Sequence, residues 1–313
     1  MKFYVAVTDH TWFTFLSEQS NVEEVNFWTP RPWSGQFGVV AKGGPFLFKL
    51  KSPHNAIAGG GYFEHYTTLP ISLAWDAFEE KNGASTLEEV RQRTGRLRQV
   101  TPRPWEDFTI GCIIVVEPYF WPEDMWIRDI PGWHPNIQRG RSYELASEEG
   151  SHLWEQVSDR IQSGIVQESI VAEKPDYTFS SGFTEPVLQP RRVGQGTFRT
   201  VILDVYQRRC AITLERALPT LDAAHIRDYS EVPVHYVQNG ILLRADIHRL
   251  FDKGYLTVTP DYRVEVSQRI HEDFDNGENY LRLTGERIAV PEQLALQPSP
   301  EMLTWHNDNR YRG

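Results

Sequence analysis

Two short stretches in the second half of the chain decide how that half folds. Residues 221–226 read LDAAHI, and residues 237–252 read VQNGILLRADIHRLFD. His225 and Asn239 lie 14 positions apart, and Asn239 and His248 lie 9 apart. An Asn-Gly pair is typical of a tight turn, and the apolar residues around it predict a hairpin-like segment followed by a helix.

These stretches resemble the HNH nuclease family in the spacing of the three residues and in the sequence around them. Members of that family fold as a ββα-metal unit, which presents a strand histidine, a loop asparagine and a helix histidine around one divalent ion. The resemblance covers about residues 198–270 and implies a C-terminal nuclease domain. It implies His225 as the general base, Asn239 as the residue that orients it, and His248 as a metal ligand.

Phosphodiester hydrolysis explains why such a site needs these residue types. A base must take a proton from water, and a cation must offset the charge that develops on the phosphate and the leaving oxygen. A histidine with its ordinary pKa near 6.5 serves as a base at neutral pH, and a neutral imidazole binds a metal. A lone histidine is more often a core residue and a lone Asn-Gly only a turn, so the prediction depends on all three residues occurring together.

The second metal ligand is where the sequence departs from the family. Many relatives carry an acid directly before the base histidine, whereas Ala224 stands there and Asp222 is the nearest upstream acid. Residues three apart on a strand face opposite sides, so we expect Asp222 to reach the ion only through a bulge or turn. Asp246 competes more weakly, because it lies on a different helix face from His248. We expect one divalent ion, and an imidazole with a carboxylate accepts Mg²⁺, Mn²⁺, Co²⁺ or Ni²⁺.

Arginines around the motif are candidates for contact with the DNA backbone. A guanidinium group can form two parallel hydrogen bonds with phosphate oxygens, which suits a backbone clamp. A solvated charge run is the alternative for each of them. The residues are Arg191, Arg192, Arg199, Arg208 and Arg209 before the motif, and Arg244 and Arg249 beside the helix histidine.

Length and composition indicate a folded protein of two domains. The chain has 313 residues and a formal net charge of -10, with 40% hydrophobic and 12% aromatic residues. No apolar run reaches the roughly 18 residues of a membrane span, and residues 1–10 lack the apolar run of a signal peptide. We therefore expect a cytoplasmic protein with no membrane partner. Cys112 and Cys210 lie far apart and outside any CxxC pair, which excludes a disulfide framework and a four-thiolate zinc site.

A change in composition along the chain predicts where the domains lie. Eight of the ten tryptophans lie at or before Trp133, and the later sequence is richer in Arg, Leu, Ile and Val. We expect a reader domain over residues 1–150, a helical and irregular linker over 151–197, a nuclease domain over 198–290 and an extended tail over 291–313.

The pattern of apolar residues predicts the α+β fold class. Strand signals in the first part cover residues 3–7, 45–50, 56–66 with an interruption at three glycines, and 108–116. Helical signals cover residues 9–18, 71–81 and 86–98, the last with Ser85 as the candidate N-cap. Later signals are a helix over 148–170, a helix or strand over 198–206, a hairpin over 211–226, a helix over 242–251, and strands over 255–258 and 262–266.

The first part of the chain looks like an EVE domain of the PUA superfamily. The resemblance is carried by NFWTPRPW at residues 26–33, GPFLFKL at 44–50 and AIAGGGYF at 56–63. Chains that join such a domain to a C-terminal HNH unit resemble modification-dependent restriction endonucleases, which bind 5-methylcytosine or 5-hydroxymethylcytosine in double-stranded DNA. The resemblance implies a PUA-like, β-barrel-type domain with helices that reads a modified base.

A modified base flipped from the duplex would stack between aromatic faces, with its methyl group in a small apolar cavity. The alternative is that large aromatic residues form the core of a small mixed domain. Candidates for the pocket are Trp28, Trp33, Tyr62 and Trp75, with His54 or Asn55 for the Watson–Crick edge.

Two other functions are compatible with the sequence. One is an HNH nuclease whose first domain recognises RNA or unmodified DNA. The other is a non-enzymatic nucleic-acid binding protein with a degenerate nuclease fold. A single HNH site nicks one strand per encounter, so double-strand cutting would require a homodimer or two successive visits.

Overall fold

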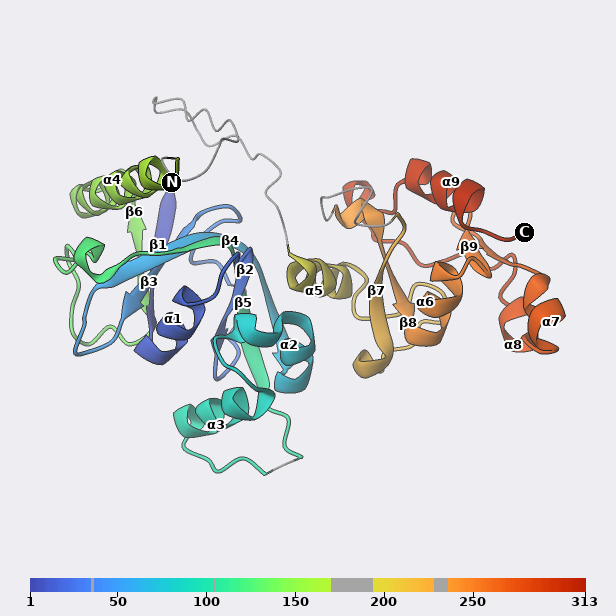
Figure 1. Ribbon diagram of the computed structural model, residues 1–313, viewed down its shortest axis with the longest axis horizontal. Helices are drawn as coiled ribbons and strands as arrows, with labels where there is room; N and C mark the ends of the chain where they lie inside the picture. The colour runs from blue at the N-terminus through green and yellow to red at the C-terminus, as the bar shows by residue number, and fades with distance from the viewer. Residues whose placement is uncertain (35–36, 104, 170–193, 228–235) are drawn as a thin grey trace. The chain divides into compact units, whose positions relative to one another are not determined.

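The protein consists of two compact units, Met1–Arg192 and Val193–Gly313 (Figure 1). The computed structural model describes residues 1–34, 37–103, 105–169, 194–227 and 236–313. Each unit mixes helices with strands, so the predicted α+β class is confirmed. The two units are described separately below.

Unit 1 is built on one six-stranded sheet with the strand order β2-β5-β4-β3-β1-β6. β1 and β3 run parallel, and the other neighbouring strands run antiparallel. The strands are β1 (Lys2–Thr8), β2 (Glu24–Thr29), β3 (Pro45–Leu50), β4 (Ile57–Pro70), β5 (Thr109–Phe120) and β6 (Gly140–Glu144).

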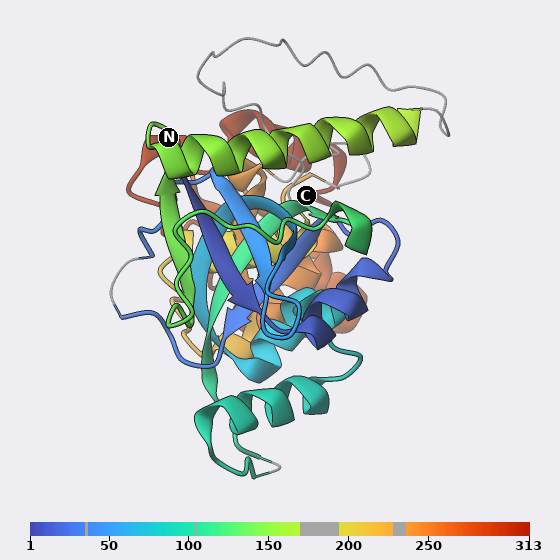
Figure 2. The same ribbon diagram turned by 90° about the vertical axis from the view of Figure 1, so that its left-hand side faces the viewer.

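Helices cover both faces of this sheet. Side chains alternate between the faces along a strand, and Phe46 and Phe48 of β3 therefore belong to one apolar cluster while Leu47 belongs to the other. α1 packs on the first cluster and α4 on the second, and Figure 2 shows α4 running crosswise to the strands. The helices are α1 (His10–Ser17), α2 (Ile71–Phe78), α3 (Leu87–Arg98) and α4 (Glu148–Ser169), with 3-10 turns η1 (Glu79–Asn82) and η2 (Glu123–Met125).

The three glycines of β4 do not interrupt the strand, contrary to the sequence prediction. An ideal Cβ at Gly59 would lie 2.2 Å from the carbonyl oxygen of Tyr119, and one at Gly61 would lie 2.5 Å from Cγ1 of Val115. β5 therefore approaches β4 too closely for side chains at these positions, so the glycines permit the pairing.

Two helix boundaries in unit 1 also differ from the prediction. The N-cap of α3 is Thr86, whose side chain accepts a hydrogen bond from the backbone N–H of Glu89, and not Ser85. The Ser85 hydroxyl donates instead to the Glu89 carboxylate. The helix predicted over residues 71–81 ends at Phe78 and continues as the 3-10 turn η1.

Unit 2 surrounds a single apolar cluster, to which two short antiparallel hairpins, β7–β8 and β9–β10, contribute. Its strands are β7 (Leu221–His225), β8 (Gly240–Arg244), β9 (Leu256–Val258) and β10 (Val264–Val266). Its helices are α5 (Gln195–Val205), α6 (Ala245–Asp252), α7 (Arg269–Phe274), α8 (Glu278–Leu281) and α9 (Pro300–Asn309), with 3-10 turns η3 (Leu218–Thr220), η4 (Val237–Asn239) and η5 (Leu294–Leu296).

Three sequence predictions for the connecting and C-terminal segments were wrong or incomplete. The helix predicted over 242–251 begins only at Ala245, because residues 240–244 pair with β7. The extended tail predicted over 291–313 contains α9, since Pro300 suits the first turn of a helix and Ser299 caps it. Residues 153 and 157, assigned to a linker, lie in the core of unit 1 through α4; residues 170–193 lie outside the described residues.

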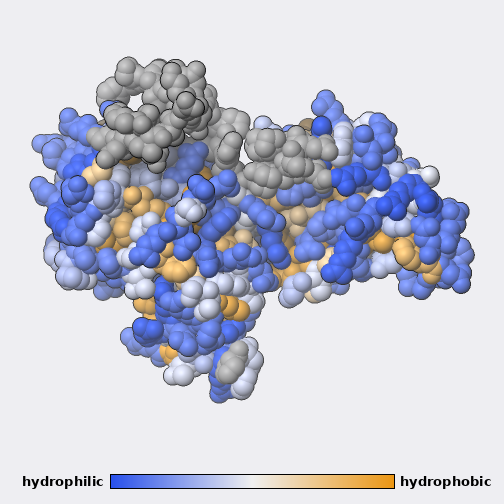
Figure 3. Space-filling view, viewed as in Figure 1, coloured by the Kyte–Doolittle hydropathy of each residue, from blue (hydrophilic) through white to orange (hydrophobic). Residues whose placement is uncertain are grey.

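Within the described parts of the chain, no helix combines the length and apolar character needed to cross a membrane. The surface visible in Figure 3 is mostly hydrophilic on both units, with scattered apolar patches.

Candidate active site

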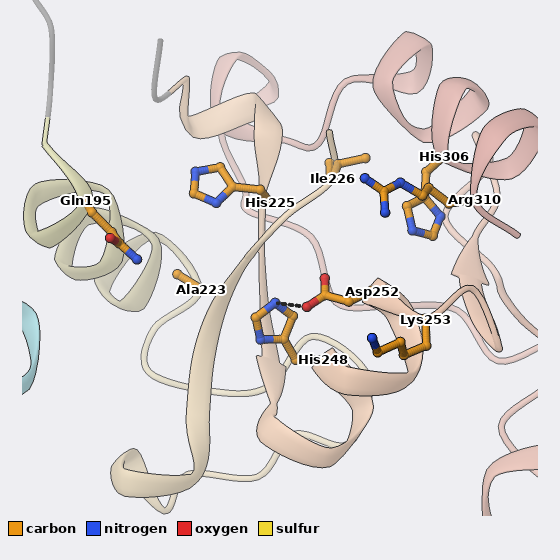
Figure 4. Close-up of a pocket in the computed structure, with 9 residues that line it drawn as sticks. All are labelled: Gln195, Ala223, His225, Ile226, His248, Asp252, Lys253, His306 and Arg310. Carbon is orange, nitrogen blue, oxygen red and sulfur yellow. Dashed lines mark ion pairs between the residues drawn. The ribbon is translucent and has the colours of Figure 1, made fainter. Parts of the chain in front are cut away.

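β7, β8 and α6 form a strand–strand–helix arrangement that carries the three residues of the motif. The strands pair from Leu221 opposite Arg244 to His225 opposite Gly240, and α6 begins at Ala245, directly after β8. This arrangement borders a cavity of about 400 Å³ (Figure 4). The cavity is lined by Gln195, Ala223, His225, Ile226, His248, Asp252, Lys253, His306 and Arg310.

Asn239 ties together the two chain segments next to His225. Its side chain is fully buried, accepts a hydrogen bond from the Arg227 N–H at 2.9 Å and donates one to the Arg227 carbonyl at 2.9 Å. The Ile226 N–H donates to the Asn239 carbonyl, also at 2.9 Å. These bonds extend the β7–β8 pairing past His225, and they are the contacts expected of a residue that orients the histidine.

His225 lies at the last position of β7 and is half-buried. Its ring stacks on Phe198 of α5, with the ring centres 4.0 Å apart and the planes at 9°. Because a stacked ring has few accessible orientations, Phe198 and the β7–β8 pairing together fix the side chain that lines the cavity.

His248 lies between two carboxylates. Its Nδ1 is 3.4 Å from Asp222 Oδ2, and its Nε2 is 3.4 Å from Asp252 Oδ2, one helical turn further along α6. Burial alone lowers the pKa of His248, but the hydrogen bond with Asp222 and the charge of Asp252 outweigh burial and raise it. The site therefore favours a positive charge at this position, carried either by a proton or by a bound cation.

Asp222 contacts His248, although it does not line the cavity with His225. The β7–β8 register is regular through Asp222, which pairs with Leu243, and α6 crosses next to that position. The hydrogen bond with His248 lowers the pKa of Asp222, more than burial raises it, and Arg199 and Arg249 lower it further. The carboxylate is therefore ionised at neutral pH.

Asp252 is a site residue that sequence reasoning missed. It lines the cavity and contacts His248, and burial raises its pKa from the ordinary value. The signal was available, because residues four positions apart on a helix lie on one face.

His248 and one neighbouring carboxylate could supply two ligands of a divalent ion. The His248 nitrogen and the Asp222 oxygen lie 3.4 Å apart and form only a weak hydrogen bond. Both atoms could nevertheless bind one ion at about 2.1 Å. The residues present therefore fit an ion held by His248 with Asp222 or Asp252. No group of three or more histidine, cysteine or acidic side chains poised to bind a metal occurs among the residues the structure describes.

Asp246 and Arg244 pair with each other beside the cavity. Arg244 donates to both carboxylate oxygens of Asp246, at 2.6 and 2.8 Å, and the Tyr280 hydroxyl donates to Asp246 at 3.0 Å. The Arg244 hydrogen bonds, together with the weaker Tyr280 bond, lower the pKa of Asp246 to about 2. The contacts of Asp246 therefore stabilise the start of α6.

The other arginines proposed for the DNA backbone have different surroundings. Arg208 forms an ion pair with Asp204 at 3.2 Å, and Arg209 donates to the side chain of Gln207. Arg249 is exposed on α6. Arg191 and Arg192 lie outside the described residues.

The six residues predicted for a base pocket lie on β2, β4, α2 and loops of unit 1. Trp28 of β2 donates its indole N–H to the Asn82 carbonyl at 2.9 Å. Across the sheet, Trp28 pairs with Cys112 of β5, which pairs with Thr67 of β4. Tyr62 lies five residues before Thr67 on β4, which corresponds to about 17 Å along a strand. Trp75 is half-buried on α2. The Asn82 side chain also donates to the carbonyl of Ala74, which directly precedes Trp75.

The remaining pocket candidates lie near loops. Trp33 donates its backbone N–H to the Tyr66 hydroxyl at 2.7 Å. His54 stacks on His10, with ring centres 4.4 Å apart, and Asn55 accepts a hydrogen bond from Lys49 at 3.3 Å. His54 and Asn55 are neighbours in the chain, and all six assignments stay predictions.

Comparison with known protein families identifies the fold of this site. Residues 210–259 match the family described as HNH endonuclease. The matched segment includes β7, β8 and α6, and with them His225, Asn239 and His248. Unit 2 contains an HNH endonuclease domain. No curated protein matches the chain.

Solved structures of ASCH from Zymomonas mobilis are distantly similar to the half of the chain that precedes the HNH domain. The ASCH structure is 11% identical, covers 49% of this chain and 94% of its own, and has a TM-score of 0.31. Two point mutants of it are 11% and 9% identical, each cover 50% of this chain and 98% and 95% of their own, and have TM-scores of 0.30 and 0.32.

Proposed function

We propose that this protein is a metal-dependent DNA endonuclease that cuts double-stranded DNA carrying modified cytosine. The HNH domain of unit 2 would cut the DNA, and unit 1 would read the modified base. One observation carries the nuclease part: His225 and His248, both in the segment that matches the HNH endonucleases, line the same cavity.

Each residue of the motif has a distinct task in this proposal. His225 accepts the proton of the attacking water through a ring nitrogen, and Phe198 and Asn239 hold it in place. His248, with Asp222 or Asp252, would hold one divalent ion of the Mg²⁺, Mn²⁺, Co²⁺ or Ni²⁺ type. A bound ion would supply positive charge that offsets the charge developing on the phosphate.

The reader part of the proposal assigns 5-methylcytosine or 5-hydroxymethylcytosine, flipped out of the duplex, to unit 1. It rests on the resemblance of residues 26–63 to an EVE domain. His54 and Asn55 are neighbouring predicted contacts, and the stacked His10 ring adds an aromatic face there. The proposal also includes action in the cytoplasm, where cysteine thiols stay reduced, and a homodimer wherever both strands are cut in one encounter.

Cleavage of one plasmid in three forms tests the proposal. The plasmid is prepared with unmodified, 5-methylated and 5-hydroxymethylated cytosine, and each form is incubated with Mg²⁺ or Mn²⁺ and with a chelator. We expect cutting of modified DNA only, abolished by the chelator. Equal cutting of all three forms would retain the nuclease and reject the modified-base reader. No cutting under any condition, together with binding, would favour a nucleic-acid binding protein.

A further inference from the structure

One wall of the cavity comes from outside the segment that matches the HNH family. The match ends at residue 259, whereas His306 lies on α9 and Arg310 follows that helix. Figure 4 shows both residues on the same side of the cavity as Lys253, which follows α6. Elements far apart in the sequence therefore bring two cationic side chains to one wall.

Buried contacts of His306 hold α9 against the end of α6. Its ring stacks on Phe251 with ring centres 3.8 Å apart, and its Nε2 lies 3.2 Å from the Phe251 carbonyl oxygen. Its Nδ1 lies 2.8 Å from the Thr257 hydroxyl. Burial lowers the pKa of His306 to about 4, so the residue is neutral at pH 7 and acts through position instead of charge.

The turn after α6 fixes the backbone of Arg310. Gly254 has a φ of 75°, and an ideal Cβ there would lie 2.0 Å from the Arg310 carbonyl oxygen. The Arg312 N–H donates to the Gly254 carbonyl at 2.9 Å. A side chain at residue 254 would therefore displace the chain that carries Arg310.

The charge of the cavity lining differs from that of the chain as a whole. The net charge of the chain is -10, yet the lining has two cations, Lys253 and Arg310, and one carboxylate, Asp252. His225 and His248 line the same cavity. The candidate base and both cations therefore line the same cavity.

We propose that Lys253 and Arg310 bind the phosphodiester that is cut, so that the C-terminal helix completes the active site. This inference rests on the proposed nuclease function. Arg310 presents a planar fork that suits two phosphate oxygens, and Lys253 adds a mobile point charge. A cavity of about 400 Å³ lies within the size range of small-ligand sites.

Substitutions of the two cations test the inference in the full chain. Arg310→Gln and Lys253→Gln are compared with wild-type protein and with Arg282→Gln, which removes an exposed cation on another part of unit 2. We expect single-turnover cleavage to fall roughly 10- to 100-fold for each cavity variant and to be unchanged for Arg282→Gln. Arg310→Lys keeps the charge but loses the fork, and should recover only part of the rate.

A binding measurement separates a phosphate contact from a loss of folding. Each substitution is also made in a His225→Ala background, and affinity for the DNA that wild-type protein cuts is measured against salt concentration. Loss of one phosphate contact should lower the slope of log affinity against log salt by about one, with the melting temperature unchanged. Wild-type cleavage together with unchanged rates in both cavity variants would overturn this inference alone. Wild-type protein that cuts no DNA would overturn the proposed function and this inference with it.

Discussion

Asn82 of unit 1 and the two motif histidines of unit 2 have opposite surroundings. In unit 1, the Asn82 amide donates to the Ala74 and Glu79 carbonyls and accepts from Asn26, so the group is enclosed by protein. In unit 2, His225 and His248 are held by neighbours on one side and face a cavity on the other. An enclosed network can only stabilise a fold, whereas a network with one open side is available for chemistry.

Removal of the candidate base should show this difference most strongly. We expect His225→Ala to lower cleavage of modified DNA by about 10²- to 10⁴-fold, because a general base contributes that much, while binding is retained. Single-turnover nicking and an equilibrium binding assay measure the two effects. His271→Ala, which removes an exposed histidine of α7, is the matched control. A variant with wild-type cleavage would contradict the assignment of His225.

Removal of the enclosed amide should affect stability instead of chemistry. Asn82→Ala leaves the Ala74 and Glu79 carbonyls and the Asn26 amide without their partner, and we expect a loss of about 2–4 kcal/mol in the free energy of unfolding of unit 1. Urea denaturation followed by tryptophan fluorescence measures it, since nine of the ten tryptophans lie in unit 1. Gln19→Ala, at an exposed position, should have almost no effect. If Asn82→Ala protein folds but no longer cleaves DNA, Asn82 has a role in cleavage, and the contrast between the two units is contradicted.

The pKa values of the two cavity histidines His248 and His306 are shifted in opposite directions. The pKa of His248 is raised above 6.5, and that of His306 is lowered to about 4. In metal-free protein, protonated His248 stabilises the fold fully below pH 6.5, and this stabilisation is lost as the pH rises through the raised pKa. His306 is buried in its neutral form, so its contribution to stability is lost as the pH falls from 6.5 through its lowered pKa of about 4. An NMR titration of the imidazole resonances measures both values, with His248→Gln and His306→Gln to assign them.

An excess of divalent ion provides the check on this pH effect. Protons and the ion compete for His248, so added Mg²⁺ or Mn²⁺ should lower its apparent pKa. His306 should be unaffected. An unchanged His248 titration at saturating ion would contradict its assignment as a metal ligand.

The smallest expected difference separates two arginines of the motif. Arg244 forms two hydrogen bonds with the Asp246 carboxylate, whereas Arg249 is exposed on α6. We expect Arg249→Gln to lower the salt slope of DNA binding by about one, and Arg244→Gln to leave it nearly unchanged. Affinity measured at several salt concentrations in the His225→Ala background tests this. Equal slopes for the two variants would show that the ion pair does not decide which arginine meets DNA.

The sequence predicted the elements whose signal is local. β1, α1 and β3 lie within about two residues of their predicted ranges, because their apolar patterns and turns are self-contained. β4 was predicted with a break at its glycines, since the reason for them, the close approach of Tyr119 and Val115, comes from a strand about 50 residues later. α9 was missed for a similar reason: its buried face is completed by Phe251 and Thr257, distant in sequence.

The candidate site divides in the same way. His225, Asn239 and His248 followed from the resemblance to the HNH family, which their spacing and sequence context carry. The contact between Asp222 and His248 depends on where α6 crosses β7, and strand geometry alone does not give that position. Arg310 reaches the cavity only because α9 packs on the turn at Gly254, and no local pattern signals that packing.

The amide of Asn239 has a consequence for how this protein can change in evolution. Its side chain bonds to both the N–H and the carbonyl of Arg227, as a neighbouring strand would, so the segment between the two residues is closed at its base. The entropy cost of closing a loop grows slowly with loop length, by about 0.6 kcal/mol for each doubling. Insertions between Arg227 and Asn239 could therefore accumulate, and acquire new DNA contacts, while the geometry of His225 is inherited unchanged.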